Sequence, residues 1–345
     1  MLELIDKLKS NRNLDRKEFA LLVAGADPAV RGYARELAVA VARDVFGDRV
    51  FIRGLIEFTN YCRNDCFYCG IRRSNAGASR YRLDKDDILD CCREGYGLGF
   101  RTFVLQGGED GYYGDEVLAD IVATMRAGYP DCAITLSVGE RSRESYQRLF
   151  DAGANRYLLR HETASPEHYA KLHPESLSLA ERKRCLRDLK EIGYQTGCGF
   201  MVGSPYQTPE NIADDLLFLA DFQPEMVGIG PFIPHRDTPF ADFPPGDVDL
   251  TLFLLSLVRL MLPRTLIPAT TALGTRDANG REKGILAGAN VVMPNLSPLS
   301  VRKKYLLYND KICTDAEAAE HLDELERRLA AIGYRVVYER GDFQL

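Results

Sequence analysis

The segment YCRNDCFYCG, residues 61–70, places three cysteines in one short loop, Cys62, Cys66 and Cys69, with the spacing C-x3-C-x2-C. Thiolates are soft ligands that suit zinc and iron–sulfur clusters. Most structural sites for either use four protein ligands. Three close cysteines with no nearby histidine therefore favour a [4Fe–4S] cluster with one iron open to a substrate or cofactor. A zinc site with its fourth ligand elsewhere in the chain is the alternative.

This spacing, with the aromatic Tyr68 before the third cysteine, resembles the loop of the radical S-adenosylmethionine (SAM) enzymes. In that superfamily the open iron chelates the amino and carboxylate groups of SAM. The reduced cluster then cleaves the sulfonium to a 5′-deoxyadenosyl radical. The resemblance implies a [4Fe–4S] cluster and SAM as cofactors.

The chain of 345 residues has the composition of an ordinary soluble globular protein, with 46% hydrophobic and 27% charged residues. Its net charge of −6 gives no reason to expect nucleic-acid binding. The longest apolar segment, Leu250–Leu262, is too short to span a bilayer, so no membrane partner is expected. The nine cysteines are an odd number and the first residues do not resemble a signal peptide. We therefore expect a reducing cytoplasm rather than a disulfide framework.

Short apolar runs alternate with amphipathic stretches, which predicts an α/β protein with parallel strands and right-handed crossovers. The period of roughly 30 residues and the total length fit a (βα)8 barrel of the TIM type, with a doubly wound sheet as the alternative. We expect an N-terminal helical extension (1–50), the barrel (51–295), and a C-terminal capping segment of the same domain (296–345). The predicted strands are Val50–Phe58, Thr102–Gln106, Ala133–Val138, Arg156–Leu159, Gln195–Met201, Met226–Gly230, Leu266–Thr271 and Asn290–Met293. The predicted helices are Lys85–Gly97, Asp115–Ala127, Ser142–Ala152, Ser178–Ile192, Pro209–Phe222, Leu250–Leu262 and Arg281–Ala287.

Polar residues follow nearly every predicted strand, at the end where a (βα)8 barrel holds its active site. Gln106-Gly107-Gly108-Glu109 follows the second strand, and its two glycines let the backbone pass close to a ligand. Radical SAM enzymes carry a similar Gly-Gly-Glu segment whose backbone contacts the methionine amino group. A simple strand-to-helix turn is the alternative for this segment alone.

The triplet Arg160-His161-Glu162 follows the fourth strand. Glu162 could accept bonds from a ribose or an ammonium group, and Arg160 could pair with a carboxylate. We expect His161 to be a hydrogen-bonded supporting residue rather than a catalytic base. Arg182 could hold the SAM carboxylate or could equally be a surface arginine.

The later strands end in residues that suit a flat ligand or line a cavity. Ile229 could pack on adenine, whereas His235 has no partner at metal-ligand spacing and is expected to be structural. Thr270 and Thr271 would point in opposite directions in a strand, so at most one enters the barrel unless the strand is bulged or ending. Threonine is also a good strand former, so both could be purely structural.

Assembled, these segments resemble the HydE family, the radical SAM maturases of [FeFe]-hydrogenases. The strings that carry the resemblance are EFTNYC (57–62), LQGGED (105–110), YLLRHET (157–163), MVGIGPFIPH (226–235), PATTA (268–272) and GANVVMPN (288–295). They span essentially the whole chain. The cysteine loop is typical of the superfamily, and the longer strings are typical of the family.

The resemblance implies a role in assembling the di-iron subcluster of the hydrogenase H-cluster. The substrate would be a cysteine-bound iron carbonyl–cyanide precursor made by a sister radical SAM enzyme, and the radical would attack sulfur. An electron donor is also implied. The SAM side would comprise Tyr68, Gln106, Gly107, Gly108, Glu109, Glu162, Arg182, Met201 and Ile229. The substrate cavity would be lined by Thr135, Arg160, Thr270, Thr271, Met293, Tyr305 and Tyr308.

Some members of the family carry a second cluster near the C-terminus on three cysteines, but only Cys313 occupies that region here. One thiolate cannot hold a cluster, so we expect the SAM cluster alone. A related radical SAM enzyme acting on an organic amino-acid substrate, such as a methylornithine synthase or biotin synthase, is one alternative. A zinc-binding scaffold or maturation chaperone is the other.

Overall fold

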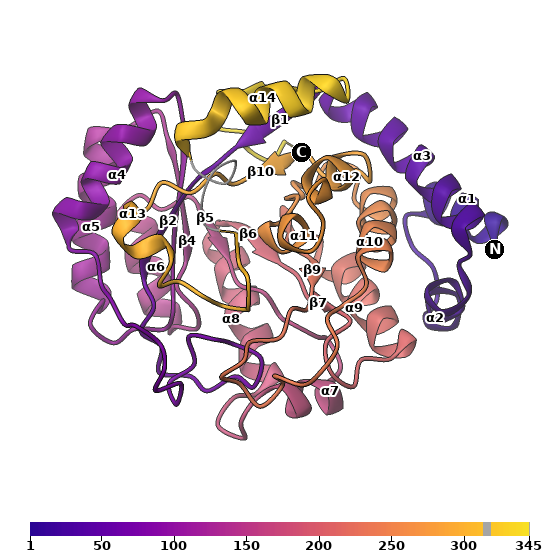
Figure 1. The fold of residues 1–345 in the computed structure, drawn as a ribbon, viewed down its shortest axis with the longest axis horizontal. Helices are drawn as coiled ribbons and strands as arrows, with labels where there is room; N and C mark the ends of the chain where they lie inside the picture. The colour runs from indigo at the N-terminus through magenta and orange to yellow at the C-terminus, as the bar shows by residue number, and fades with distance from the viewer. Residues whose placement is uncertain (313–318, 345) are drawn as a thin grey trace.

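Six parallel strands form the largest sheet of the computed structural model, which describes residues 1–312 and 319–344 (Figure 1). Neighbouring strands in this sheet follow one another along the chain, as expected for successive strand–helix units. In spatial order the strands are β2 (Gly54–Thr59), β3 (Thr102–Gly107), β4 (Ala133–Ser137), β5 (Arg156–Leu158), β6 (Gln195–Cys198) and β8 (Met226–Val227).

Further parallel pairings continue the sheet from β8 back to β2. Leu266 bridges to Met226 of β8, and Pro268 bridges to β10 (Val291–Val292). Beyond β10, Asn295 bridges to Leu55 of β2. The predicted (βα)8-type barrel is therefore confirmed, and the doubly wound alternative is wrong.

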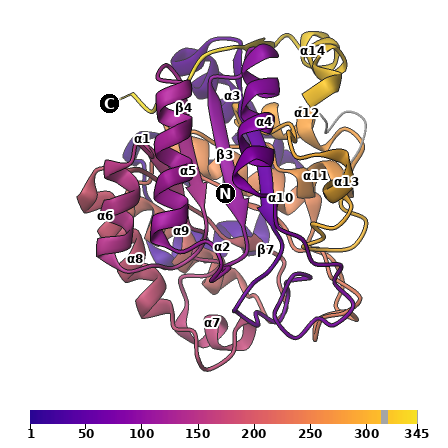
Figure 2. The same cartoon turned by 90° about the vertical axis from the view of Figure 1, so that its left-hand side faces the viewer.

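All seven predicted helices are present and lie outside the strands (Figure 2). The N-terminal caps Asp84, Ser142 and Thr208 each accept a hydrogen bond from a backbone amide of the first turn. The helices are α4 (Lys85–Gly97), α5 (Asp115–Gly128), α6 (Arg143–Asp151), α8 (Leu179–Ile192), α9 (Pro209–Phe222), α10 (Val248–Met261) and α12 (Gly280–Ile285).

The N-terminal and C-terminal segments pack onto the barrel. Helix α2 (Arg16–Gly25) lies against α9, while α1 (Leu2–Asn11) and α3 (Pro28–Phe46) lie against α10 (right side of Figure 1). At the other end of the chain, β11 (Arg335–Val337) pairs with β1 (Arg49–Ile52), the strand that directly precedes β2. The remaining C-terminal elements are α13 (Leu299–Arg302), a short 3-10 helix (Ala319–His321) and α14 (Leu322–Ala331).

Four predicted strands are interrupted or cut short. The first is divided at Arg53 into β1 and β2. The fifth and sixth are each interrupted, giving β6 and β7 (Met201–Val202) and then β8 and β9 (Gly230–Pro231), with β7 and β9 paired. A Cβ atom on Gly199 would lie 2.0 Å from the carbonyl oxygen of Gly228, so the two interruptions pack directly on each other. The seventh forms only isolated bridges, at Leu266 and Pro268, and the chain then turns into α11 (Thr271–Arg276), which Thr270 caps. Helices α11 and α7 (Pro166–Leu172) were not predicted.

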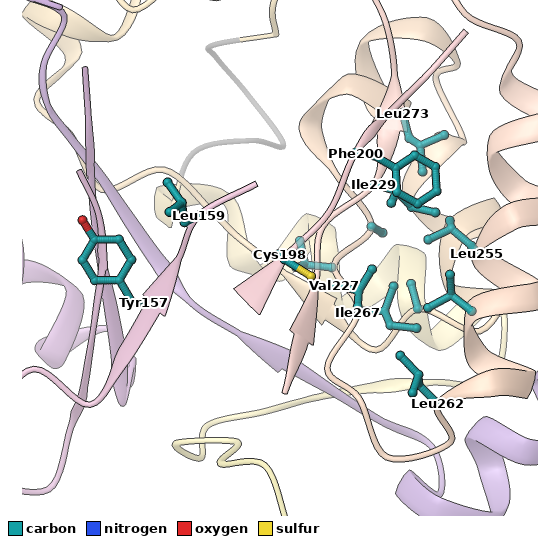
Figure 3. Packing of buried hydrophobic residues seen from close by; sticks show 14 of the residues in the cluster. Tyr157, Leu159, Cys198, Phe200, Val227, Ile229, Leu255, Leu262, Ile267 and Leu273 are labelled. Carbon is teal, nitrogen blue, oxygen red and sulfur yellow. The ribbon is translucent and has the colours of Figure 1, made fainter. Parts of the chain in front are cut away.

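The main hydrophobic core fills the space between the strands and the surrounding helices. Figure 3 shows Phe200, Ile229 and Ile267, from the strand side, beside Leu255 of α10. All four side chains are completely buried. This packing fixes the strands, and with them the loops at their carboxyl ends.

Candidate active site

A cavity of about 300 Å³ lies at the carboxyl ends of the strands, under the cysteine loop. The loop, which joins β2 to α4, lies at the lower edge of Figure 2 beside α7. The cavity brings together most of the predicted site residues, namely Cys62, Cys66, Tyr68, Cys69, Gln106, Gly107, Gly108, Glu109, Arg160, Glu162, Arg182, Met201, Thr270, Tyr305 and Tyr308.

Four predicted residues do not line this cavity. Ile229 is completely buried in the hydrophobic core (Figure 3), and Thr271 forms the first turn of α11. Met293 is partly buried against an apolar cluster at β1, β8 and β10. Thr135 lies two residues before Ser137, which lines the cavity, and therefore shares its side of β4 deeper in the barrel. Its hydroxyl group is buried without a hydrogen-bond partner.

Arg80 holds the cysteine loop together through its guanidinium group. It donates to the carbonyl oxygens of Asn60 and, on the other side of the cysteines, to those of Ile71 (2.8 Å), Arg72 (2.6 Å) and Asn75 (3.2 Å). The two ends of the loop are thereby joined. Arg80 was not predicted, and its only local signal is its place in the same loop between β2 and α4.

The three cysteine thiols are partly buried, and burial raises the pKa of each. The raised pKa of Cys69 is about 12. Nearby positive charge acts in the opposite sense. Arg80 lowers the pKa of Cys62 and Cys69, and Arg182 lowers the pKa of Cys66. The loop therefore needs a cationic group to hold its thiols as thiolates, which is what a metal cluster supplies.

The three thiols of the loop all line the same cavity. Among residues 1–312 and 319–344, no three His, Cys, Asp or Glu side chains are gathered closely enough to bind one metal ion. In a cubane each thiolate binds a different iron, so the sulfur atoms stand further apart than around one zinc. Cys313, the remaining cysteine of the sequence, lies outside the described residues.

Tyr68 is held by a short chain of hydrogen bonds. His173 Nδ1 lies 3.0 Å from the carbonyl oxygen of Tyr169 and must donate to it, which leaves Nε2 as an acceptor. Tyr68 then donates its hydroxyl proton to Nε2 over 3.1 Å. Burial lowers the pKa of His173 to about 3, so this imidazole is neutral at physiological pH.

A network of alternating charges lies beside the cysteines. Arg182 donates to the carboxylate of Glu140 and, over 2.8 Å, to the carbonyl oxygen of Arg160. The backbone amide of Glu140 donates to Glu109, which also accepts from Arg63 over 3.0 Å. Arg182 is 7% exposed, so its position is fixed and a surface location is excluded.

Arg160 and Glu162 face each other across the cavity wall, with 3.1 Å between Nη2 and Oε2. This ion pair does not meet hydrogen-bond geometry. Nε and Nη2 of Arg160 and Oε2 of Glu162 are therefore all buried without a hydrogen-bond partner. Glu162 also has a φ of 64°, which is uncommon for a residue with a side chain. Unsatisfied polar atoms and backbone strain at one place are typical of a ligand site.

His161 points away from this cavity into the protein. Its Nδ1 accepts from the backbone amide of Gly199 (3.3 Å), so Nε2 carries the proton toward Asp215 (3.2 Å). Burial lowers the pKa of His161 and raises that of Asp215. His161 is therefore buried and hydrogen-bonded within the protein, as expected. Nδ1 of His235 likewise accepts a hydrogen bond from the backbone amide of Asp237. The loop that carries His235 packs against Gly70.

The capping segment closes the cavity beside the cysteine loop, where the backbone amide of Gly70 donates to the carbonyl oxygen of Leu307 over 2.8 Å. Lys311 donates to the buried carboxylate of Glu57 on β2 and, over 3.1 Å, to the carbonyl oxygen of Tyr305. Its ammonium group also lies 4.8 Å from the centre of the Tyr305 ring. The hydroxyl group of Tyr305 accepts a long bond from Gln106 (3.5 Å). Neither Lys311 nor Glu57 was predicted, because they are 254 residues apart in sequence.

Three thiols in the loop after the first barrel strand define a radical SAM enzyme. The model of the Radical SAM superfamily matches residues 56–219. The [FeFe] hydrogenase maturase subunit HydE of Thermotoga maritima is 48% identical over 305 residues, covering 87% of each chain. The chain therefore belongs to the HydE family and is a radical SAM hydrogenase maturase.

Solved structures agree with this fold. The crystal structure of methylornithine synthase (PylB) is 27% identical with a TM-score of 0.83 and 97% of both chains covered. The crystal structure of HydG, a maturase of the [FeFe]-hydrogenase, is 20% identical with a TM-score of 0.82. The match covers 98% of this chain and 76% of the HydG chain. Membership of the superfamily implies a [4Fe–4S] cluster and SAM, and the thiols and charges of the cavity fit both. No helix in the described ranges is both long and apolar enough to cross a membrane.

Proposed function

We propose that this enzyme acts on a cysteine-bound iron carbonyl–cyanide precursor of the hydrogenase di-iron subcluster. The observation that carries the proposal is the guanidinium group of Arg160 at the cavity wall, whose Nε and Nη2 atoms are buried without a hydrogen-bond partner, Nη2 having only the ion pair with Glu162. An anionic complex carrying an amino-acid carboxylate can satisfy these donors. Burying such an anion without them would be costly.

Cys62, Cys66 and Cys69 hold the cluster in this proposal, and SAM lies between the cysteine loop and the ends of β3 and β5. When bound, the cluster and SAM together supply the 5′-deoxyadenosyl radical. Glu162 accepts from the SAM ammonium or ribose, and Arg182 presents positive charge to its carboxylate. The backbone at Gly107 and Gly108 approaches the methionine moiety. A Cβ atom on Gly108 would lie 2.1 Å from the carbonyl oxygen of Tyr61, so this strand end must stay close to the loop.

The deeper cavity supplies neutral polar groups around the substrate. Thr270 and Tyr308 line the cavity, and the partnerless hydroxyl of Thr135 lies further inside the barrel. Hydroxyl groups can donate to carboxylate oxygens or cyanide nitrogens without competing for iron as a thiolate would. Tyr305 of the capping segment also lines the cavity. Sister maturases would supply the precursor and receive the product.

The cluster is tested by replacing Cys62, Cys66 or Cys69 with Ala and measuring iron and reductive SAM cleavage in anaerobically prepared protein. We expect about four irons per chain in the wild type and no cleavage in any of the three variants. The Cys313→Ala variant should retain both the iron content and the SAM cleavage of the wild type. Stoichiometric zinc, or a second cluster that disappears with Cys313, would contradict the assignment.

SAM binding is tested by Glu162→Gln and Arg182→Ala. Each removes a charge-assisted contact worth roughly 1.5–3 kcal/mol, so SAM should bind about tenfold more weakly or worse while the cluster still assembles. Arg148→Ala, an exposed arginine of α6, is the matched control. Unchanged SAM affinity in both site variants would place SAM elsewhere.

The substrate is tested by Arg160→Gln. We expect hydrogenase maturation to be lost while uncoupled SAM cleavage continues, because the side chain faces the substrate. The structural likeness to methylornithine synthase makes an organic amino-acid substrate the alternative. Formation of methylornithine by the wild type, or full maturation by the variant, would overturn the proposal.

A further inference from the structure

The cysteine loop carries positive charge in a chain whose overall charge is negative. Residues 61–82 contain five arginines and one aspartate, which gives a net charge of +4, whereas the whole chain carries −6. The remainder of the chain therefore carries −10. A charge asymmetry of this kind steers an acidic partner toward the loop and away from the rest of the surface.

Exposed tyrosines and arginines form a patch on the outer face of this loop. The guanidinium carbon of Arg82 lies 3.9 Å from the ring centre of Tyr61 and 4.9 Å from that of Tyr112. Tyr61 is 37% exposed and Tyr112 is 61% exposed. Tyrosine and arginine are the side chains most enriched at the centres of protein interfaces.

The carboxylates that pair with these arginines lie beneath them. Arg63 contacts Glu109 at 3.0 Å and Arg82 contacts Asp110 at 2.7 Å, and both carboxylates are buried. The side chain of Arg63 is 65% exposed, so the guanidinium groups rather than the carboxylates face solvent. Arg73 extends the patch, because its backbone amide donates to the carbonyl oxygen of Asn64 and its side chain is exposed.

The patch lies directly outside the cysteines. Tyr61 and Arg63 flank Cys62 in sequence, while Cys62 itself lines the cavity on the inner side of the loop. A partner on this patch would be separated from a cluster in the cavity only by the thickness of the loop. SAM and substrate would occupy the inner side, so the outer side is the open approach to the cluster.

We propose that Tyr61, Arg63, Arg73, Arg82 and Tyr112 form the docking surface for an acidic one-electron carrier protein. The inference rests on the proposed cluster at Cys62, Cys66 and Cys69. The carrier is oxidised by one electron and the cluster is reduced by one electron, with no bond made or broken in the transfer. Positive charge and aromatic anchors fit an acidic protein.

The test compares two reductants on the cluster-loaded full chain, with SAM cleavage as the measurement. One is a reduced acidic [2Fe–2S] ferredoxin and the other is dithionite, a small molecule that needs no docking surface. The test variant combines Arg73→Glu with Tyr112→Ala, neither of which lines the cavity. The matched control combines Arg148→Glu on α6 with Tyr338→Ala near the C-terminus, both exposed residues away from the loop.

We expect the ferredoxin-driven rate to fall about tenfold or more in the test variant and to stay unchanged in the control. Dithionite-driven cleavage should stay within about twofold in both, and added salt should slow only the ferredoxin reaction. An unchanged ferredoxin-driven rate in the test variant, or equal losses in the two variants, would overturn the docking surface. Failure of the wild type to cleave SAM with dithionite would instead overturn the proposed function.

Discussion

Replacing Arg80 should loosen the cysteine loop without disturbing the barrel. The guanidinium group bonds one carbonyl before the cysteines and three after them, so it acts as an internal clamp. Arg80→Ala removes all four bonds. Arg80→Lys retains the charge but not the planar array of donors that reaches several carbonyls at once.

The expected magnitude follows from these contacts. A hydrogen bond from a charged donor is worth roughly 1.5–3 kcal/mol, but bonds that share one side chain do not add independently and Arg80 is partly exposed. We expect Arg80→Ala to lower the free energy of opening the loop by about 2–4 kcal/mol. A loss of about 2 kcal/mol raises the population of the open loop roughly 30-fold.

Amide hydrogen exchange on the cluster-free chain measures this change. Protection at residues 60–75 should fall in Arg80→Ala and, to a smaller extent, in Arg80→Lys, while strands β3 and β4 keep theirs. The cluster-loaded Arg80→Ala protein should also lose iron faster on dilution. Arg73→Ala is the control, because that arginine belongs to the same loop but is exposed. Equal exchange in Arg80→Ala and the control would refute the clamp.

Three further changes test other contacts of the site. Lys311→Met leaves the Glu57 carboxylate buried without its cation, so the free energy of unfolding should fall by about 3–5 kcal/mol in urea titrations. Gly70→Ala would place Cβ 2.2 Å from the carbonyl oxygen of Leu306 in the capping segment, so proteolysis near that segment should accelerate. His173 has a folded-state pKa of about 3, below its unfolded value, so its neutral form stabilises the protein above about pH 6.5. That stability is lost as pH falls from about 6.5 toward 3, and His173→Gln should flatten the loss in cluster-free protein.

Control variants and contrary outcomes distinguish these contacts from nonspecific effects of substitution. Gly111→Ala is the control for Gly70, because a Cβ atom there meets nothing within 4 Å. Equal proteolysis of the two glycine variants would show that the capping segment does not depend on close packing at the loop. A stability loss below about 1 kcal/mol for Lys311→Met would contradict the buried ion pair. Parallel pH profiles for His173→Gln and wild type would contradict the neutral imidazole.

The predictions that succeeded rest on local chemistry. The meeting of three thiols at one cavity follows from residues within eight positions of one another. The helices follow from apolar periodicity together with caps such as Asp84 and Thr208, which act within one turn. The strands alternate with these helices, and that order alone favours a parallel barrel. These features need no knowledge of distant contacts.

The errors and omissions arise where distant segments meet. The sequence shows an apolar strand through Ile229 but not which face it turns inward, because both faces of a barrel strand are apolar. The strand interruptions depend on Gly199 packing against Gly228, and the clamp by Arg80 depends on the path of the whole loop. Lys311 meets Glu57 only when the capping segment folds over the barrel. Residue types and local spacing therefore determined the chemistry and the order of elements, whereas close packing between distant segments decided which side chains reach the cavity.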